Sequence, residues 1–186
     1  METHHAFIRK CTFSYRYAAR AFPWPLLSPH SSDTVLLNIR LLIENARQAQ
    51  VPVFFARHIG PDDSPFSEQS PLTQLIPELN VNAEQDIVFI KKYPSCFRDT
   101  ELQLQLSQRG VKQLVIAGMK TEFCVDTTCR AAPEHGFRTV LISDAHTTMD
   151  NKYLSASEII AHHNVTLAGP FVTLATAACW SFHSEK

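Results

Sequence analysis

The stretch Leu114-Val-Ile-Ala-Gly-Met-Lys-Thr-Glu-Phe-Cys124 combines the local signals that decide the fold of this chain. Its first four residues are apolar without a break, which is typical of a strand buried on both faces of a parallel sheet. Gly118 ends this run, and good helix formers extend from Thr121 to about His135. A strand, a tight turn and a helix start predict that Cys124 lies at the carboxyl edge of the sheet, where open α/β sheets bind ligands.

Cys124 at this position has two interpretations. The unpaired backbone N–H groups and the positive dipole end of a helix start favour a thiolate, which indicates a nucleophile. Free cysteine is also among the most buried residue types and often only fills space. Cys129, five residues further along the helix, lacks the position at the helix start and is interpreted as packing.

Composition restricts the class of protein. The chain has 186 residues, 45% of them hydrophobic, and this is long enough for one domain with a sizeable core. The formal net charge of −1 favours no nucleic acid or strongly charged partner. Five cysteines without paired spacing are typical of reduced cytosolic thiols, and no apolar run is long enough to span a bilayer. We therefore expect a cytoplasmic protein that binds neither nucleic acid nor membrane.

Strand and helix patterns alternate from Ser31 onward. This alternation predicts a three-layer α/β/α domain over residues 31–186, with a mostly parallel, Rossmann-like doubly wound sheet. The expected helices are Ser31–Gln50, Thr100–Arg109, Thr121–His135 and Ser155–Asn164, and the expected strands are Val51–Ala56, Asp86–Lys91, Leu114–Ala117, Arg138–Asp144 and Phe171–Thr176.

Residues 1–30 form an atypical N-terminal segment. Residues 1–32 have a net charge of +3 (4 − 1), from Arg9, Lys10, Arg16 and Arg20 against Glu2. The weak alternation from Phe7 to Tyr17 predicts a half-exposed strand and not a central one. Three interpretations stay open: an edge strand or arm, a mitochondrial-type presequence, and a segment that is not the domain's own beginning.

The carboxyl edge of the predicted sheet gathers several chemically active side chains. A lysine ammonium beside a cysteine stabilises the thiolate, which then attacks an electrophilic carbon. Less specific roles are also open, because Arg57 and Asp144 have the charges of a structural ion pair, and the histidines suit hydrogen-bonded wall residues better than metal ligands. No metal or cofactor is expected. The residues at this edge are Arg57, His58, Lys91, Cys124, Asp144 and His146.

A specific motif identifies a family. It reads Ala117-Gly-Met-Lys-Thr-Glu-Phe-Cys-Val-Asp-Thr-Thr-Cys-Arg-Ala-Ala132, and is followed by Gly136-Phe-Arg-Thr-Val-Leu-Ile-Ser-Asp-Ala-His-Thr-Thr148. Both segments closely resemble the isochorismatase-like cysteine hydrolases. The resemblance extends through Lys91-Lys-Tyr-Pro-Ser-Cys-Phe97 and Val51-Pro-Val-Phe-Phe-Ala-Arg-His58, and covers roughly residues 33–170.

The resemblance implies an Asp–Lys–Cys triad, in which Cys124 matches the nucleophile and Lys91 the catalytic lysine. It also implies a cis peptide bond between Met119 and Lys120, with the backbone N–H groups of Lys120 and Cys124 directed at a developing oxyanion. The implied reaction cleaves an amide or ureido-type C–N bond of a small molecule through a thioacyl-enzyme on Cys124. Relatives often form dimers or tetramers, so a homo-oligomer is expected.

Substrate contacts are expected from Phe97, Arg57 and His146. The loop from Ile59 to Pro71 is expected to shape the pocket, because it is long and follows a strand at the ligand edge.

One part of the family pattern is missing. The family begins with a central apolar strand that ends in the catalytic aspartate, whereas this chain has no carboxylate between Glu2 and Asp33. The abrupt change near residue 30 is consistent with a shifted reading frame or a misplaced start joined to an intact domain. Two functional hypotheses follow: a working cysteine hydrolase in which another residue replaces the aspartate, or an inactive relative that acts as a binding module.

Overall fold

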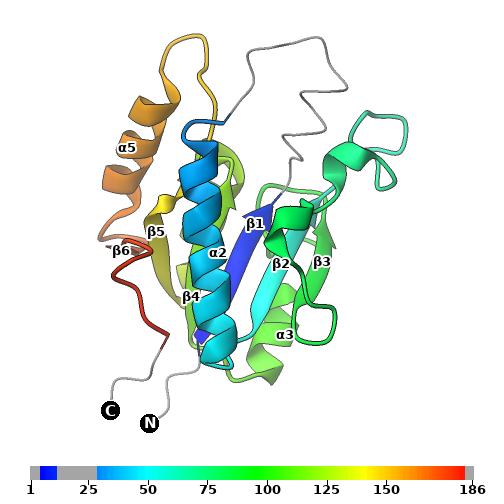
Figure 1. Ribbon diagram of the computed structural model, residues 1–186, viewed down its shortest axis with the longest axis vertical. Helices are drawn as coiled ribbons and strands as arrows, with labels where there is room; N and C mark the ends of the chain where they lie inside the picture. Colours follow the sequence, from blue (N-terminus) through cyan, green and yellow to red (C-terminus); the bar gives the residue numbers. More distant parts are fainter. Residues whose placement is uncertain (1–4, 12–28, 183–186) are drawn as a thin grey trace.

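The computed structural model describes residues 5–11 and 29–182, which are built around a parallel sheet (Figure 1). The described residues form six strands in the order β3-β2-β1-β4-β5-β6. The chain winds outward from β1 in both directions, so the topological switch point, where such sheets bind ligands, lies between β1 and β4. The strands are β1 (His5–Cys11), β2 (Val53–His58), β3 (Ile87–Lys91), β4 (Gln113–Met119), β5 (Arg138–Thr147) and β6 (Thr173–Ala175).

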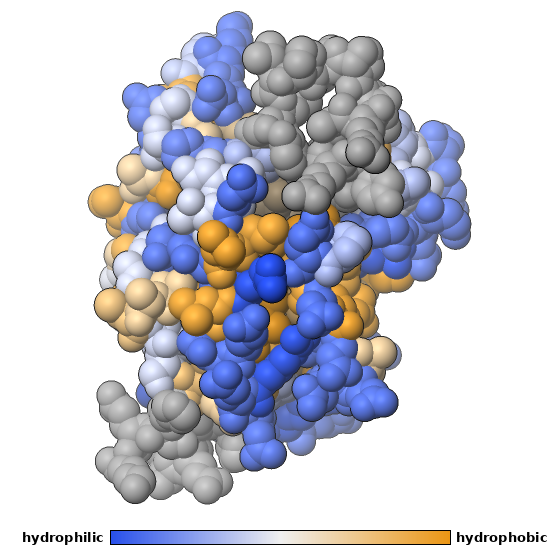
Figure 2. Space-filling model, in the orientation of Figure 1, coloured by the Kyte–Doolittle hydropathy of each residue, from blue (hydrophilic) through white to orange (hydrophobic). Residues whose placement is uncertain are grey.

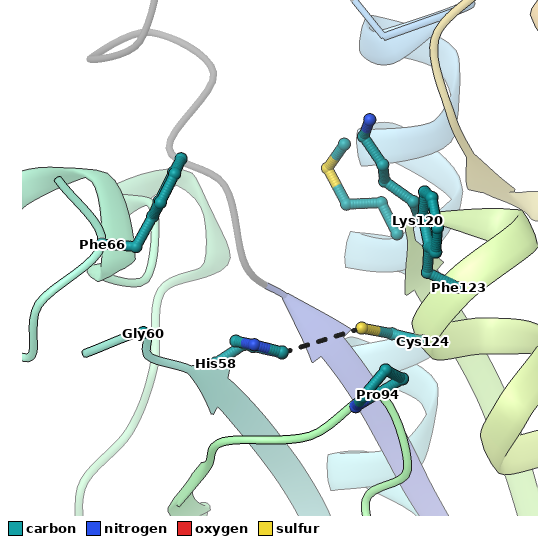
Figure 3. A pocket seen from close by; sticks show the side chains of 8 residues that line it. His58, Gly60, Phe66, Pro94, Lys120, Phe123 and Cys124 are labelled. Atoms are coloured by element: carbon teal, nitrogen blue, oxygen red, sulfur yellow. Dashed lines mark hydrogen bonds between the residues drawn. The ribbon is translucent and has the colours of Figure 1, made fainter. Parts of the chain in front are cut away.

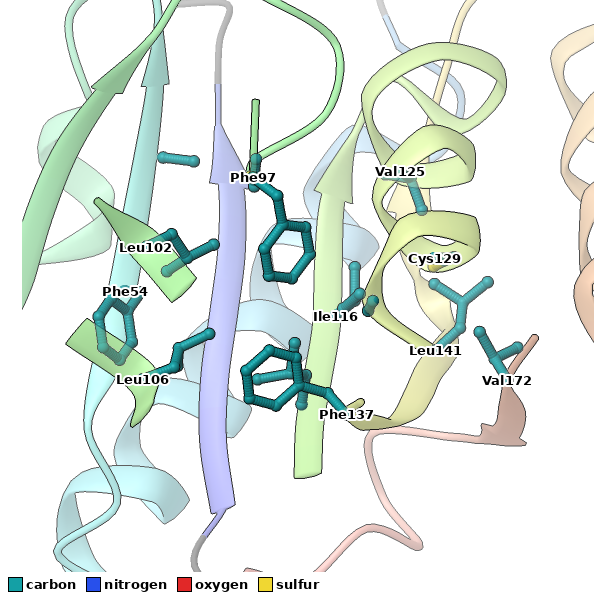
Figure 4. Packing of buried hydrophobic residues seen from close by; sticks show 14 of the residues in the cluster. Phe54, Phe97, Leu102, Leu106, Ile116, Val125, Cys129, Phe137, Leu141 and Val172 are labelled. Carbon is teal, nitrogen blue, oxygen red and sulfur yellow. The ribbon is translucent and has the colours of Figure 1, made fainter. Parts of the chain in front are cut away.

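Helices cover both faces of the sheet and confirm the three-layer α/β/α architecture. On β4, Val115 packs into one buried cluster and Ile116 into the other, as the alternation of a strand requires. The first cluster contains residues of α2, and the second contains residues of α3 and α4 (Figure 4). The helices are α2 (Ser32–Gln48), α3 (Leu102–Gln108), α4 (Asp126–Glu134) and α5 (Ala156–Leu167), with shorter turns at η1 (Pro71–Thr73), η2 (Pro77–Leu79) and η3 (Thr121–Val125).

Helix α2 confirms the helix that the apolar spacing after Ser31 predicts. Its buried side chains recur at helical spacing, so they form one stripe against the sheet. The opposite side leaves Leu37 and Leu41 exposed, and Figure 2 shows apolar surface interrupted by hydrophilic side chains on this face. The buried stripe consists of Val35, Ile39, Leu42, Ile43 and Ala46.

Residues His5–Cys11 correct the expectation of a half-exposed edge strand or arm. They form the central strand β1, in which Phe7 pairs with Val53 of β2 and with Val115 of β4. Without this strand, the facing backbone groups of β2 and β4 would lie unpaired, at about 1–3 kcal/mol for each buried group. Backbone pairing therefore places a strand of mixed composition at the centre. The presequence and reading-frame hypotheses concern residues 1–30, of which residues 1–4 and 12–28 lie outside the described residues, and they stay predictions.

The remaining expected elements are present, with one informative difference. The strand expected to end at Asp144 continues to Thr147, and its pairing with β4 shifts register between Ile116 and Gly118. This extension places His146 inside β5 and not in a loop. Within residues 5–11 and 29–182, no helix is both long enough and apolar enough to cross a membrane.

Candidate active site

The turn after β4 carries Cys124. The peptide bond between Met119 and Lys120 is cis, at the position implied by the family resemblance. The turn continues as the short helix η3, which bears the half-buried, free thiol of Cys124 and leads directly into α4. The predicted sequence of strand, turn and helix is therefore confirmed.

Lys91 lies at the end of β3 and is 2% exposed. Its Nζ atom is 3.2 Å from Cys124 Sγ and 2.9 Å from His58 Nδ1. It also donates to the carbonyl oxygens of Tyr93 (2.7 Å) and Pro94 (3.2 Å). An ammonium has three protons, so four candidate acceptors surround three donors. The structure thus brings together the two residues that the sequence assigned to catalysis.

His58 is the third member of this cluster. Its Nδ1 atom lies 3.9 Å from Cys124 Sγ (Figure 3, dashed line). His58 and Lys91 are register partners at the ends of β2 and β3, which explains why their side chains meet. The expectation that His58 is a wall residue of the site is consistent with this position, but its contacts with both Lys91 and Cys124 were not foreseen.

A cavity of about 340 Å³ opens over these groups, and a volume of this order suits a small molecule. Most of its lining side chains are apolar, and among the described lining residues the only charged one besides the titratable His58 and Cys124 is Lys120. The lining residues are His58, Gly60, Phe66, Pro94, Met119, Lys120, Phe123 and Cys124 (Figure 3).

The loop from Ile59 to Pro71 contributes Gly60 and Phe66 to the cavity, as expected from its length and position. A Cβ atom at Gly60 would lie 2.9 Å from Ser64 Oγ and 3.2 Å from Phe66 Cβ. Gly60 therefore allows Ser64 and Phe66 to lie close to the backbone of residue 60, and a larger residue there would push them away.

The loop that follows Lys91 is fixed to α4. The backbone N–H of Cys96 donates to Thr128 Oγ1 at 3.0 Å, and both residues are fully buried. Thr100 Oγ1 donates to the carbonyl oxygen of Cys96 at 2.6 Å. These bonds tie the segment that supplies the Tyr93 and Pro94 carbonyls to the helix that follows Cys124.

His146 lies behind the turn that carries Cys124, and not in the cavity lining. It is 1% exposed, its Nδ1 lies 2.9 Å from Thr121 Oγ1, and its Nε2 lies 2.9 Å from Asn164 Oδ1. Burial lowers the pKa of His146, and the hydrogen bond with Asn164 opposes this only in part. The expected substrate contact is thus replaced by a link from β5 and α5 to the first residue of η3.

Phe97 also differs from its expected role. Its side chain is buried in the core between the sheet and helices α3 and α4 (Figure 4), and its ring stacks on His135 and Phe137 at centroid distances of 4.3 and 5.9 Å. Phe97 therefore lies away from the cavity, and it is not among the described residues that line it.

Arg57 contacts the loop and not Asp144, and it is not among the described residues that line the cavity. Its Nη2 donates to the carbonyl oxygen of Glu68, whereas Asp144 Oδ1 accepts from the backbone N–H of Ala177 at 2.8 Å. Among the described residues no ion pair joins Arg57 and Asp144, so that structural interpretation is wrong. Neighbouring residues of a strand point to opposite faces, which separates Arg57 from the cavity-lining His58.

Sequence reasoning did not single out Phe123 or Pro94 as lining residues of the cavity. Phe123 and Pro94 each adjoin a predicted catalytic residue or its loop, but composition does not show which side of a loop faces a pocket. The signal for His58 was present, because it ends one strand as Lys91 ends the next.

Known proteins resemble this chain in sequence and in fold. The isochorismatase domain model matches residues 16–183. The chain is 30% identical over 141 residues to the secreted isochorismatase effector Isc1 of Verticillium dahliae, covering 75% of this chain and 74% of that protein. It is 31% identical to nicotinamidase 3 of Arabidopsis thaliana, covering 66% and 69%. The crystal structure of an isochorismatase from Pseudomonas putida KT2440 superposes with a TM-score of 0.83 at 28% identity, covering 94% of this chain and 89% of that one.

The fold and the match to the domain model define the class of protein as an isochorismatase-fold hydrolase. The chain belongs to the isochorismatase family.

Proposed function

We propose that this protein hydrolyses an amide or ureido-type C–N bond of a small molecule through a thioacyl-enzyme on Cys124. The observation that carries the proposal is the 3.2 Å contact between Lys91 Nζ and Cys124 Sγ beside the cavity. A fixed ammonium stabilises the thiolate, which is the nucleophilic form of cysteine.

The proposed reaction has two halves. The thiolate attacks the carbonyl carbon, the oxyanion that forms accepts hydrogen bonds from the backbone N–H groups of Lys120 and Cys124, and the C–N bond breaks as the nitrogen takes up a proton. Water then attacks the thioacyl carbon, the C–S bond breaks, and the acid is released as the thiolate reforms. No cofactor takes part in this scheme.

The cavity favours a particular kind of substrate. Phe66, Phe123, Met119 and Pro94 supply an apolar lining suited to a flat or hydrocarbon group. The ammonium groups of Lys91 and Lys120 favour a neutral or anionic molecule over a cationic one. The similarity to a protein named as a nicotinamidase supports an amide. A homo-oligomer and a cytoplasmic location stay predictions.

A direct test incubates the protein with a panel of primary amides, nicotinamide among them, and N-carbamoyl compounds, and measures released ammonia. Intact-mass spectrometry after acid quench then detects an acyl adduct. We expect turnover of at least one compound, and loss of both turnover and adduct in Cys124→Ala. The matched control is Cys179→Ser, which removes an exposed free thiol outside the cavity lining and leaves turnover unchanged.

The alternative of an inactive binding module makes the opposite prediction. If Cys124 is not an activated nucleophile, it should react with iodoacetamide at pH 6.5 no faster than a model thiol. No acyl adduct should then form with any compound of the panel. That result would contradict the proposed hydrolysis.

A further inference from the structure

We propose that His58 is the proton acceptor for the Cys124 thiol, in the role that a carboxylate plays in the family's implied triad. This inference rests on the proposed function of the same site. It starts from the arrangement in which His58 Nδ1 lies 2.9 Å from Lys91 Nζ and 3.9 Å from Cys124 Sγ. A cysteine activated by an adjacent imidazole is a general solution for nucleophilic catalysis.

The hydrogen bonds of Lys91 allow His58 to change its protonation state. When Nδ1 is unprotonated, it accepts a hydrogen bond from the Lys91 ammonium. When Nδ1 takes up a proton it no longer accepts, yet three acceptors remain for the three ammonium protons: the Tyr93 carbonyl, the Pro94 carbonyl and Cys124 Sγ. The ammonium therefore stays fully hydrogen-bonded in both states, and the protonated Nδ1 is left to face the thiolate.

A carboxylate does not compete for this role among the described residues around the cluster. None of the four hydrogen bonds of Lys91 is to a carboxylate, and none of the described residues that line the cavity is acidic. The strand β1, which ends beside Arg57 and Gly118, carries no Asp or Glu in its sequence. Glu122 lies two residues before Cys124, but its Oε2 is buried without a partner and it does not line the cavity.

The negative charge on sulfur offsets the two positive charges that then lie side by side, on the His58 imidazolium and on the Lys91 ammonium. Among the residues whose side chains the structure describes, the titratable groups near His58 are Lys91 from β3, and Cys124 and Lys120 from the turn after β4. Proton transfer from sulfur to Nδ1 creates an imidazolium 2.9 Å from an ammonium, but it creates at the same time a thiolate at the third corner of the triangle that these three atoms form. The anion is 3.2 Å from one cation and 3.9 Å from the other, so each cation gains an opposite charge.

The proposed steps balance in protons and electrons. The S–H bond breaks, its proton moves to Nδ1, and the sulfur electron pair forms the C–S bond with the substrate carbonyl. When the C–N bond breaks, its electron pair stays on nitrogen, which takes the proton back from Nδ1. In the second half Nδ1 removes a proton from the attacking water and returns it to sulfur or releases it to solvent.

The test measures acylation by p-nitrophenyl acetate in a stopped-flow instrument, because this ester acylates a reactive cysteine without a known natural substrate. We expect His58→Ala to lower the acylation rate by about 100-fold or more, within the range of general-base contributions. Added imidazole should restore at least about 10-fold of that loss, since it fills the space left by the ring. The rise of the rate with pH should lie at higher pH in His58→Ala than in the wild type, since the thiol must then ionise without a neighbouring base.

Two further variants keep the outcome interpretable. Glu122→Gln should acylate within about 3-fold of the wild type, whereas the competing assignment of Glu122 as the base requires a loss like that of His58→Ala. His58→Gln keeps a polar side chain of similar reach but cannot accept a proton, so it should acylate as slowly as His58→Ala and resist imidazole. Thermal unfolding is measured for each variant to confirm the fold.

Two results would overturn the inference while leaving the proposed function intact: wild-type acylation at Cys124 together with unchanged acylation in His58→Ala, or a loss in His58→Ala that imidazole does not restore. Absence of acylation in the wild type, judged against Cys124→Ala, would overturn the proposed function and this inference together.

Discussion

The Lys91 ammonium lies 3.2 Å from the Cys124 sulfur, although 33 residues separate them in the chain. Each residue sits at the carboxyl end of its strand or just beyond it, so the parallel sheet brings them to the same edge. The contact requires both strands to be placed correctly about β1, and it therefore depends on the tertiary fold as a whole.

Replacement of Lys91 by methionine tests this contact. Lys91→Met removes the cation beside the sulfur while keeping a side chain of similar length, so the rate of Cys124 alkylation by iodoacetamide at pH 6.5 should fall by about 10-fold or more. The fold should persist, because an apolar replacement of a buried charged group is often neutral or stabilising. Lys92→Met is the matched control, since the adjacent lysine is exposed. Equal loss in both variants would contradict the assignment.

Two phenylalanines should separate core packing from substrate contact. Phe97→Ala removes a ring buried in the core and should lower the free energy of unfolding by about 3–5 kcal/mol, as measured by urea denaturation. Phe123 is 53% exposed and lines the cavity, so Phe123→Ala should leave stability nearly unchanged and raise KM for the substrate found in the amide panel. The reverse pattern would show that Phe97 faces substrate.

His146 makes stability depend on pH. Because burial lowers its pKa in the folded state, the unfolded chain binds more protons at acidic pH. This contribution to stability is complete above the unfolded pKa of about 6.5 and is lost as the pH falls below it, by at most about 1.4 kcal/mol per pH unit.

The measurement is urea denaturation between pH 7.5 and 5.5. His146→Gln should flatten the decline relative to the wild type, because the group that titrates is gone. His162→Gln, at an exposed position of α5, should decline as the wild type does. A His146→Gln slope equal to that of the wild type would refute the assignment.

Thr128 should position Lys91 through the loop that follows it. Thr128→Val keeps the side-chain shape but leaves the buried N–H of Cys96 without its acceptor, at a cost of about 1–3 kcal/mol in unfolding free energy. If the loop shifts, the carbonyls that hold Lys91 shift with it, and kcat should fall while KM changes little. Thr127→Val is the neighbouring control, because the hydroxyl of Thr127 donates to the carbonyl oxygen of the exposed Phe123 and contacts no part of the loop after Lys91 that the structure describes. Unchanged kcat in Thr128→Val would separate this bond from catalysis.

Residue patterns by themselves determined the alternation of strands and helices and placed Lys91 and Cys124 at one edge of the sheet, whereas the cis bond after Met119 and the catalytic pairing of Cys124 with Lys91 came from the family resemblance of one motif. The local patterns and the motif can both be recognised in a single sequence. The expected strand ended three residues before β5 does, because the last two residues of β5, His146 and Thr147, are polar and pair with β4 only after a register shift.

The tertiary structure alone decided three points. It placed His5–Cys11 at the centre of the sheet, because unpaired backbone groups on β2 and β4 outweigh an unfavourable side-chain pattern. It buried Phe97 and His146 behind the site, since a strand or loop position does not reveal which face meets the core. It also placed His58 beside Lys91 and Cys124, because the side chains of three different elements meet only when their strands are aligned in the folded sheet.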